Sequence, residues 1–130
     1  GDRLPENWRK RAEHWFGEYA RVEKGAEAWR NGDIEAFGQL SFESGRSSIE
    51  KWETGSPELK KIYEIMTRTD GIYGGRFSGA GFKGCCMALI DPSFKEEIFK
   101  KVETEYLAES PDLRGHYSAC ICHSADGVKI

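Results

Sequence analysis

A run of glycines between two apolar segments constrains the fold of this chain more than any other feature. The run from Gly71 to Cys86 reads GIYGGRFSGAGFKGCC. Glycine lacks a Cβ and adopts positive φ without strain, so the run predicts a sharp bend. The flanking apolar residues favour a β-hairpin with strands over 72–77 and 85–90. Two interpretations of the glycines stay open: they relieve strain in the turn, or they allow consecutive main-chain amides to face a phosphate or sugar.

The N-terminal quarter of the chain has the periodicity of a long helix. Apolar residues recur at spacings of three and four between Trp8 and Trp29, and we expect them to face the core. These residues are Trp8, Ala12, Trp15, Tyr19, Val22, Ala26 and Trp29. Asn31 and Gly32 end the helix, and Asp33 fits the N-cap of a second, antiparallel helix. A helical hairpin is therefore predicted.

Two further helices are predicted from their start signals. Ser56 followed by Pro57 indicates an N-cap and a first helical residue, before an apolar stripe at helical spacing. Ser93 and Glu96 match a capping box for a fourth helix, which ends near Ser110. The third stripe comprises Leu59, Ile62, Tyr63 and Met66, and the fourth comprises Phe94, Ile98, Phe99, Val102 and Tyr106. The segment 117–122 is predicted to return as a strand.

The order of these elements predicts an α+β fold with helices packed on a small antiparallel sheet. The segment 85–90 is apolar on both faces, so we expect it to be a central strand that is covered on both sides. The chain has 130 residues and 38% hydrophobic content, which suits one core and a single domain over residues 1–130. The few predicted strands and the early start of the first helix suggest one part of a larger protein.

Composition narrows the classes of partner. Lys and Arg number 19 against 22 Asp and Glu, which gives a formal net charge of −3. This balance favours neither nucleic acid nor an anionic membrane surface as a partner. No apolar segment approaches the length of about 20 residues that spans a bilayer, and the first residues are charged. We expect a cytoplasmic protein.

Four cysteines occur as two close pairs, Cys85 with Cys86 and Cys120 with Cys122. Both pairs lie in strand-like apolar segments, so we interpret them as reduced thiols packed as small hydrophobic side chains. A zinc site built from Cys120, Cys122 and His123 is the alternative. Its cysteine spacing does not match the usual knuckle, so no metal is expected.

Several spaced motifs together resemble the C-terminal domain of galactokinases, within the GHMP kinase family. They are Arg11-Ala12-Glu13-His14, Glu18, Arg21-Val22, Gly32-Asp33, Phe37-Gly38, Glu43-Ser44, Ser56-Pro57-Glu58-Leu59 and the run from Gly71 to Cys85. The match covers most of the chain and keeps the order of the motifs, which makes it more specific than a glycine-rich loop alone. The resemblance implies a ferredoxin-like C-terminal domain and transfer of the γ-phosphoryl group of ATP to the anomeric hydroxyl of a galactose-type sugar.

The resemblance also implies what this chain supplies to such an enzyme. In the family, the sugar-recognition segment, the phosphate loop and the catalytic aspartate belong to an N-terminal domain, so we assign no catalytic residue here. The third family motif is present and implies a substrate- and phosphate-binding role for Ser78, Gly79, Ala80, Gly81, Phe82 and Lys83. ATP and Mg²⁺ are expected in the full-length enzyme, with a small-molecule sugar as substrate and the N-terminal domain as partner. This chain alone is expected to bind neither cofactor and to be inactive.

The third motif departs from the typical galactokinase pattern. Alanine at 80 stands between the glycines, and Lys83 follows Phe82 where glycine is usual. Ser44 is followed by Gly45, where many galactokinases have histidine. These differences resemble plant-type galacturonate kinases and imply a preference for a uronic acid. Lys83 either pairs with a substrate carboxylate or phosphate or is a solvated lysine at the rim of the hairpin.

Three other residues are interpreted from their positions in the sequence. Arg76 beside the bend fits an ion pair with a carboxylate, and His14 fits a packing role in its helix. Trp52, near the end of the second helix, lies where it can reach a ligand. A different class of function also stays open: a non-catalytic α+β module whose glycine bend binds a metabolite or serves regulation.

Overall fold

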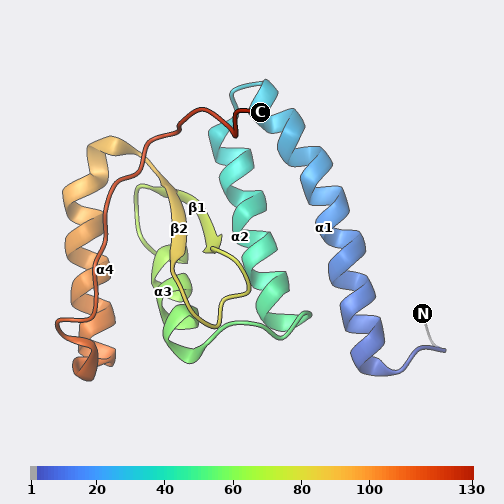
Figure 1. The fold of residues 1–130 in the computed structure, drawn as a ribbon, viewed down its shortest axis with the longest axis horizontal. Helices are drawn as coiled ribbons and strands as arrows, with labels where there is room; N and C mark the ends of the chain where they lie inside the picture. Colours follow the sequence, from blue (N-terminus) through green and yellow to red (C-terminus); the bar gives the residue numbers. More distant parts are fainter. Residues whose placement is uncertain (1–2) are drawn as a thin grey trace.

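The structure is a computed structural model that describes residues 3–130. Four α-helices pack with one two-stranded antiparallel sheet, and the predicted α+β class is confirmed (Figure 1). The elements are α1 (Glu6–Arg30), α2 (Ile34–Glu50), α3 (Pro57–Thr67), β1 (Ile72–Phe77), β2 (Cys86–Ile90) and α4 (Lys95–Glu109), with short 3-10 helices at Pro92–Phe94 and Pro111–Leu113. The elements lie side by side, with α1 and α4 at opposite ends of the molecule.

The predicted helical hairpin is confirmed. α1 ends at Arg30, Gly32 adopts a positive φ of 69°, and α2 runs back alongside α1 (Figure 1). The side chain of Asp33 accepts a hydrogen bond from the amide of Ala36 at 3.0 Å, which satisfies one of the free donors at the start of α2. The short connection forces the two helices to be antiparallel neighbours.

The apolar seam of α1 does not face the core, and this part of the sequence interpretation is wrong. Trp8, Trp15 and Trp29 are each more than half exposed, and so are Tyr19 and Val22. A different seam packs against α2, and its members are half-buried or buried at the same three-and-four spacing. They are Arg11, His14, Glu18, Arg21, Gly25 and Ala28. Small residues at the C-terminal end of this seam let α2 approach closely, and polar side chains pair with one another at its other end.

α2 rests directly on strand β1, backbone against backbone. A Cβ built on Gly38 of α2 would lie less than 3.0 Å from the carbonyl oxygen of Tyr73, and one on Gly74 would lie less than 3.0 Å from backbone atoms of Gly38. Gly74 and Gly75, which the sequence grouped with the bend, are therefore buried strand residues. Gly74 packs against α2, whereas a Cβ on Gly75 would collide with Met66 of α3 and with the backbone of β2, so both glycines serve close packing.

Two adjoining clusters form the core. Leu59, Tyr63, Met66 and Phe77 form one, between α3 and β1. Ile65, Ile98, Val102 and Tyr106 form the other, between α3 and α4. The stripe of α3 is thus buried or half-buried as predicted, and so are Ile98, Phe99, Val102 and Tyr106 of α4. Phe94, which the sequence placed in the fourth stripe, precedes α4 and is exposed, so that part of the prediction is wrong. Within the described residues, no helix combines the length and the apolar composition that crossing a membrane requires.

The helix starts are as predicted for α3 but not for α4. Ser56 accepts a hydrogen bond from the amide of Leu59 at 3.2 Å, and Pro57 is the first helical residue. The predicted capping box of Ser93 and Glu96 is not formed. Asp91 instead caps a 3-10 turn that leads into α4, because its carboxylate accepts from the amide of Ser93 at 2.9 Å.

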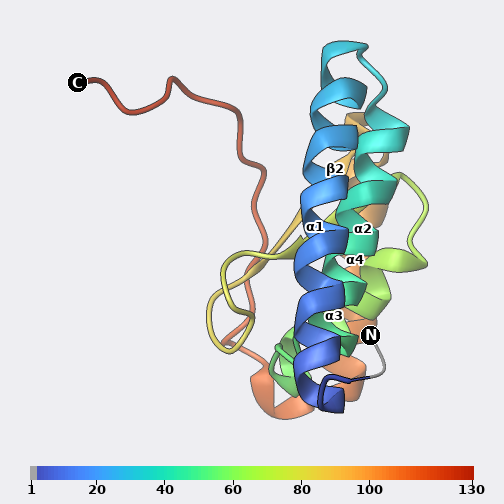
Figure 2. The same ribbon diagram turned by 90° about the vertical axis from the view of Figure 1, so that its right-hand side faces the viewer.

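The sheet has fewer strands than the sequence predicts. β1 and β2 pair antiparallel, with an irregularity between Ile72 and Gly74 that leaves Tyr73 outside the regular register. The segment 117–122 is extended but unpaired, because it leaves the body of the domain after Tyr117 and its remaining residues are exposed (Figure 2). β2 is consequently an edge strand with Met87 exposed, and the expectation of a central, doubly covered strand is wrong.

Candidate functional site and family

The predicted site residues lie in the loop that joins β1 to β2. Ser78, Gly79, Ala80, Phe82 and Lys83 are exposed, and Gly81 is buried. Figure 2 shows this loop projecting from the side of the row of helices. The loop is therefore reachable from solvent and is not covered by the helices of its own domain.

One residue anchors the loop. The carbonyl of Gly81 accepts a hydrogen bond from the amide of Ser56 at 2.6 Å, and a Cβ at Gly81 would collide with the ring of Phe77. Gly81 also has a φ of 81°, which disfavours any L side chain there. At the base of the loop the amide of Ser78 donates to the carbonyl of Cys85 at 2.9 Å. The anchor holds the exposed residues on either side in a defined path.

The exposed residues of the loop carry free main-chain donors. In the described part of the chain, the amides of Gly79, Ala80, Phe82 and Lys83 make no hydrogen bond to a protein acceptor. Successive free amides next to positive-φ glycines are the arrangement from which main-chain anion sites are built, and Gly79 and Gly81 both have positive φ. Residues 78–85 contain no acidic side chain and one cation, Lys83. The loop therefore offers donors to phosphate or carboxylate oxygens, and offers no carboxylate ligand for a metal ion.

A polar network fixes the strand that leads into the loop. Arg76 lies next to Phe77 in β1, and its guanidinium donates to Ser44 Oγ and lies 3.3 Å from Glu18 Oε2. Glu18 also accepts from Arg21 Nε at 2.9 Å and from Ser44 Oγ at 2.7 Å. The structural role predicted for Arg76 is confirmed. The network joins α1, α2 and β1 immediately before the glycine loop.

The network keeps Glu18 ionised. Burial opposes the charge of Glu18, but hydrogen bonds from Arg21 and Ser44 and the charges of Arg21 and Arg76 outweigh it, so its pKa is lowered. The sequence interpretation named Glu18 and Ser44 only as parts of a motif. The signal for their role was the polar residues Arg11, His14, Glu18 and Arg21 at helical spacing on α1.

His14 extends the same network and is a packing residue, as predicted. Its Nδ1 lies 2.8 Å from Ser47 Oγ, and its ring lies against Trp52 with ring centroids 5.5 Å apart. Burial lowers the pKa of His14, although the charge of Glu18 opposes this shift. The guanidinium carbon of Arg11 also lies over the ring of Trp52, 5.6 Å from its centroid, so Trp52 packs between α1 and the residues that follow α2.

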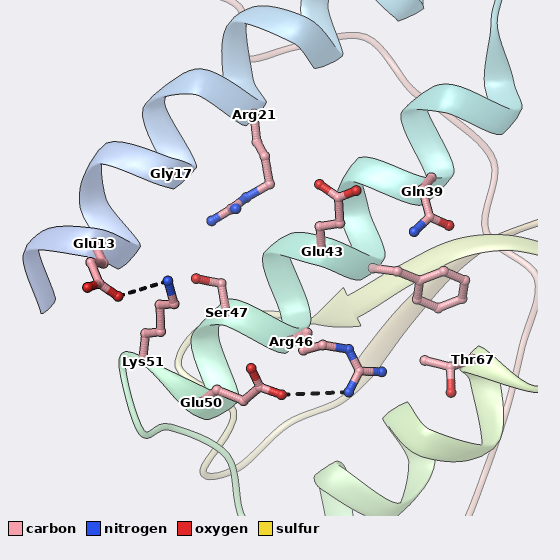
Figure 3. Close-up of a pocket in the computed structure, with 11 residues that line it drawn as sticks. Glu13, Gly17, Arg21, Gln39, Glu43, Arg46, Ser47, Glu50, Lys51 and Thr67 are labelled. Atoms are coloured by element: carbon pink, nitrogen blue, oxygen red, sulfur yellow. Dashed lines mark ion pairs between the residues drawn. The ribbon is translucent and has the colours of Figure 1, made fainter. Parts of the chain in front are cut away.

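A cavity of about 460 Å³ lies between α1 and α2, and none of the predicted site residues line it (Figure 3). Its charged walls are largely paired, with Glu13 2.9 Å from Lys51 and Arg46 3.8 Å from Glu50. Figure 3 shows both pairs at the lower end of the cavity. This mixed set of charges gives no net preference for an anion or a cation, so the glycine loop remains the better candidate site.

The cysteines are mostly exposed, contrary to the expectation that they pack in strands. Cys85, Cys120 and Cys122 are free and exposed, with the sulfur atoms of Cys120 and Cys122 3.9 Å apart. Cys86 is half-buried, and burial raises its pKa to about 12. Among residues 3–130, no group of three or more His, Cys, Asp or Glu side chains is placed to hold a metal ion.

Comparison with known proteins identifies the family. The family profile described as "GHMP kinases C terminal" matches residues 26–108, which is more than half of the chain. The chain belongs to the GHMP kinase family. This GHMP kinase domain is 44% identical to the galacturonokinase of Arabidopsis thaliana over 125 residues, and 34% identical to the galactokinase of Homo sapiens over 121 residues. Each match covers 93% of this chain, but only 30% and 29% of the relative.

The fold of the GHMP kinase domain agrees with a solved relative. The crystal structure of Lactococcus lactis galactokinase complexed with galactose matches it with a TM-score of 0.78 at 30% identity, over 82% of this chain and 28% of that one. The chain thus spans about 30% of the length of the curated relatives that it matches. It corresponds to the C-terminal domain of a galactokinase-like sugar kinase.

Proposed function

We propose that this domain serves an ATP-dependent sugar 1-kinase and that its loop Ser78–Lys83 forms one wall of the cleft that holds sugar and phosphate. One observation carries the proposal: an exposed loop, anchored at Gly81, presents main-chain donors that have no acceptor within the described chain. The loop directly follows β1, and Arg76 of β1 is held by its ion pair with Glu18, so the donors of the loop have a defined position relative to the domain.

Such a loop suits phosphoryl transfer, in which positioning and neutralisation of charge supply most of the rate enhancement. Main-chain amides contribute oriented donors that need no reorganisation during the reaction. Bound ATP and Mg²⁺ supply the phosphoryl group and the neutralising divalent charge in the full-length enzyme. The loop carries no carboxylate, and the resemblance to the family implies that the base that accepts the sugar proton belongs to the N-terminal domain.

The substrate that we propose is a galactose-type sugar with a carboxylate, such as galacturonate. Lys83 is exposed on the loop beside Phe82, and it is the cation of the segment. A charge-assisted pair between an ammonium and a carboxylate is favourable in a partly dry cleft. The 44% identity to a galacturonokinase supports this preference over neutral galactose.

The experiment is an ATP-dependent phosphorylation assay of the full-length gene product with galacturonate, galactose and N-acetylgalactosamine as separate substrates. We expect phosphorylation at the anomeric position, with galacturonate giving the highest kcat/KM. Absence of phosphoryl transfer to every sugar tested would contradict the proposed function. Activity on galactose alone would retain the kinase and reject the uronate preference.

The role of Lys83 is tested separately in the same enzyme. Replacing it with Ala is expected to raise the KM for galacturonate about tenfold, because a charge-assisted hydrogen bond contributes about 1.5–3 kcal/mol. The KM for galactose should change less than about twofold, since its hydroxymethyl group carries no charge. Lys100→Ala, an exposed lysine of α4, is the matched control. Equal effects of Lys83→Ala on both sugars would show that the lysine does not recognise the carboxylate.

A further inference from the structure

One face of α1 carries large apolar side chains that stay more than half exposed in the described chain. We call it the aromatic face, and its residues are Trp8, Trp15, Phe16, Tyr19, Val22 and Trp29, which are 58–68% exposed. At about 100° per residue they occupy roughly 140° of the helix circumference. Trp15 stacks on Tyr19 with ring centroids 6.1 Å apart and meets Phe16 edge-on at 5.0 Å, while Trp29, at the C-terminal end of the face, meets Phe37 of α2 edge-on at 5.0 Å.

This exposure lies at the upper end of what a folded monomer shows. Aromatic side chains bury about 150–250 Å² each, so the five aromatic residues at this exposure present on the order of 600 Å² of apolar surface. Monomers rarely show contiguous patches above about 300–600 Å² unless the patch has a partner. Tryptophan and tyrosine are also the residues most enriched in the buried centres of interfaces.

The rest of the domain leaves this face free because it uses other faces of α1. α2 packs against the polar seam, and the cavity of Figure 3 lies on the side of Glu13, Gly17 and Arg21. On a helical wheel the aromatic face lies on the other side of the polar seam from that cavity. α1 is also an end element of the row of helices, as Figure 2 shows from its outer side.

We infer that the aromatic face of α1 is a contact surface for the part of the same kinase polypeptide that lies outside this domain, an inference that rests on the proposed function. The length of the relatives supports this occupant. In Lactococcus lactis galactokinase the same fold forms 28% of a single chain, so more than two thirds of that polypeptide is available to adjoin it. An exposed area of this size approaches the roughly 800 Å² that one partner contributes to a standard interface.

The test measures solvent access in the full-length kinase. Oxidation of side chains by hydroxyl radicals, read by mass spectrometry, gives a rate for Trp15 and Tyr19, with Phe94 at the other end of the molecule as internal reference. If the inference holds, the oxidation rates of Trp15 and Tyr19 in the full-length kinase are at least about fivefold lower than the rates expected from their exposed fractions in this domain, because interface centres exclude water. Rates that match about 60% exposure would overturn it.

A pair of variants separates the proposed occupant from a second copy of the kinase. Trp15→Glu places a charge in the aromatic face, and Ala20→Glu places the same charge on an exposed position of α1 outside that face. Trp15→Glu should raise the oxidation rate of Tyr19 several-fold in a protein that light scattering shows to be monomeric, and Ala20→Glu should leave it unchanged. If Trp15→Glu instead splits a dimer as Tyr19 becomes reactive, the occupant is a second copy and the inference fails. If the unsubstituted full-length protein protects Tyr19 but phosphorylates no sugar, the result contradicts only the proposed function.

Discussion

Substitution of Gly38 by alanine should destabilise the domain, although the same change usually stabilises a helix. Gly38 lies within α2, where alanine is normally the more stable residue by about 1 kcal/mol. In this domain a Cβ at 38 would enter the space of the Tyr73 carbonyl in β1, at a separation below 3.0 Å that real Cβ atoms essentially never show. The obstacle is main chain, so it cannot be relieved by a change of rotamer.

The expected size of the effect follows from this geometry. Ordinary van der Waals contact begins at 3.4 Å, so α2 and β1 must separate locally before the extra methyl group fits. Overpacking of this kind costs about 1–3 kcal/mol. We therefore expect Gly38→Ala to lower the free energy of unfolding by about 1–3 kcal/mol. With a denaturant dependence of about 2 kcal/mol per molar, the urea midpoint falls by roughly 0.5–1.5 M.

Gly25 provides a matched control in the same hairpin. It is also a buried helical glycine, but its added Cβ would lie 3.5 Å from a ring carbon of Phe37, which is an ordinary contact. Gly25→Ala should therefore stabilise the domain by about 0.5–1 kcal/mol, as intrinsic helix propensity predicts. Urea unfolding followed by circular dichroism compares the two variants. A Gly38→Ala protein as stable as the wild type would refute the backbone contact between α2 and β1.

Three further predictions concern the polar network and the thiols. Glu18→Ala should destabilise the domain by about 2–3 kcal/mol in urea unfolding, since it leaves Arg21 and Arg76 without their carboxylate. The control Glu23→Ala, on the exposed side of α1, should cost less than about 0.5 kcal/mol. Equal effects of the two substitutions would refute the network. The pKa of His14 is lower in the folded state than its ordinary value of 6.5, so protonation favours unfolding and stability should fall as the pH drops below about 6.5. His14→Gln should flatten that slope between pH 7 and 5, and an unchanged slope would refute the assignment. At pH 8 iodoacetamide should leave Cys86 unmodified, because its pKa of about 12 keeps the thiol protonated, while the exposed Cys85 reacts; modification of both at one rate would contradict its burial.

Much of the fold could be predicted because its signals are local. Asp33 and Ser56 act at the helix starts, where their side chains accept hydrogen bonds from nearby free amides. The apolar stripes of α3 and α4 are buried or half-buried at the predicted spacing, except for Phe94 before the start of α4. Prediction failed where the outcome depends on contacts that are distant in sequence. The choice between the two seams of α1 is one such case.

The seam of α1 shows why a local pattern was misleading. Hydrophobicity alone selects the aromatic face as the buried one, but small residues determine how closely two helices can approach. Gly25 and Ala28 of α1 let α2 approach at one end of the seam, while Glu18 and Arg21 are satisfied by mutual pairing. The strand expected at 117–122 failed for a similar reason, because a local pattern cannot show whether a segment will pair with the free edge of a distant strand such as β2.

The candidate site was predictable in position but not in surroundings. The glycine run located the loop, and positive φ values at Gly79, Gly81 and Gly84 agree with a bend that needs glycine. The same run also contained Gly74, which packs under α2, and Gly75, which packs against Met66 of α3 and the backbone of β2. Only the structure separates these two uses of glycine, because the distinction lies in which atoms approach the missing Cβ.

The central claim is that the main-chain amides of the glycine loop bind ligand oxygens in a sugar kinase. The most direct test is Ala80→Pro in the full-length enzyme, which removes one exposed amide donor from a residue outside the positive-φ region. Ala125→Pro, in the exposed C-terminal segment, is the matched control. The account predicts that Ala80→Pro lowers kcat/KM for phosphorylation of galacturonate by at least about tenfold, in line with the loss of one preorganised donor, without a change in the unfolding midpoint. An Ala80→Pro enzyme with the activity of the Ala125→Pro control would contradict the claim.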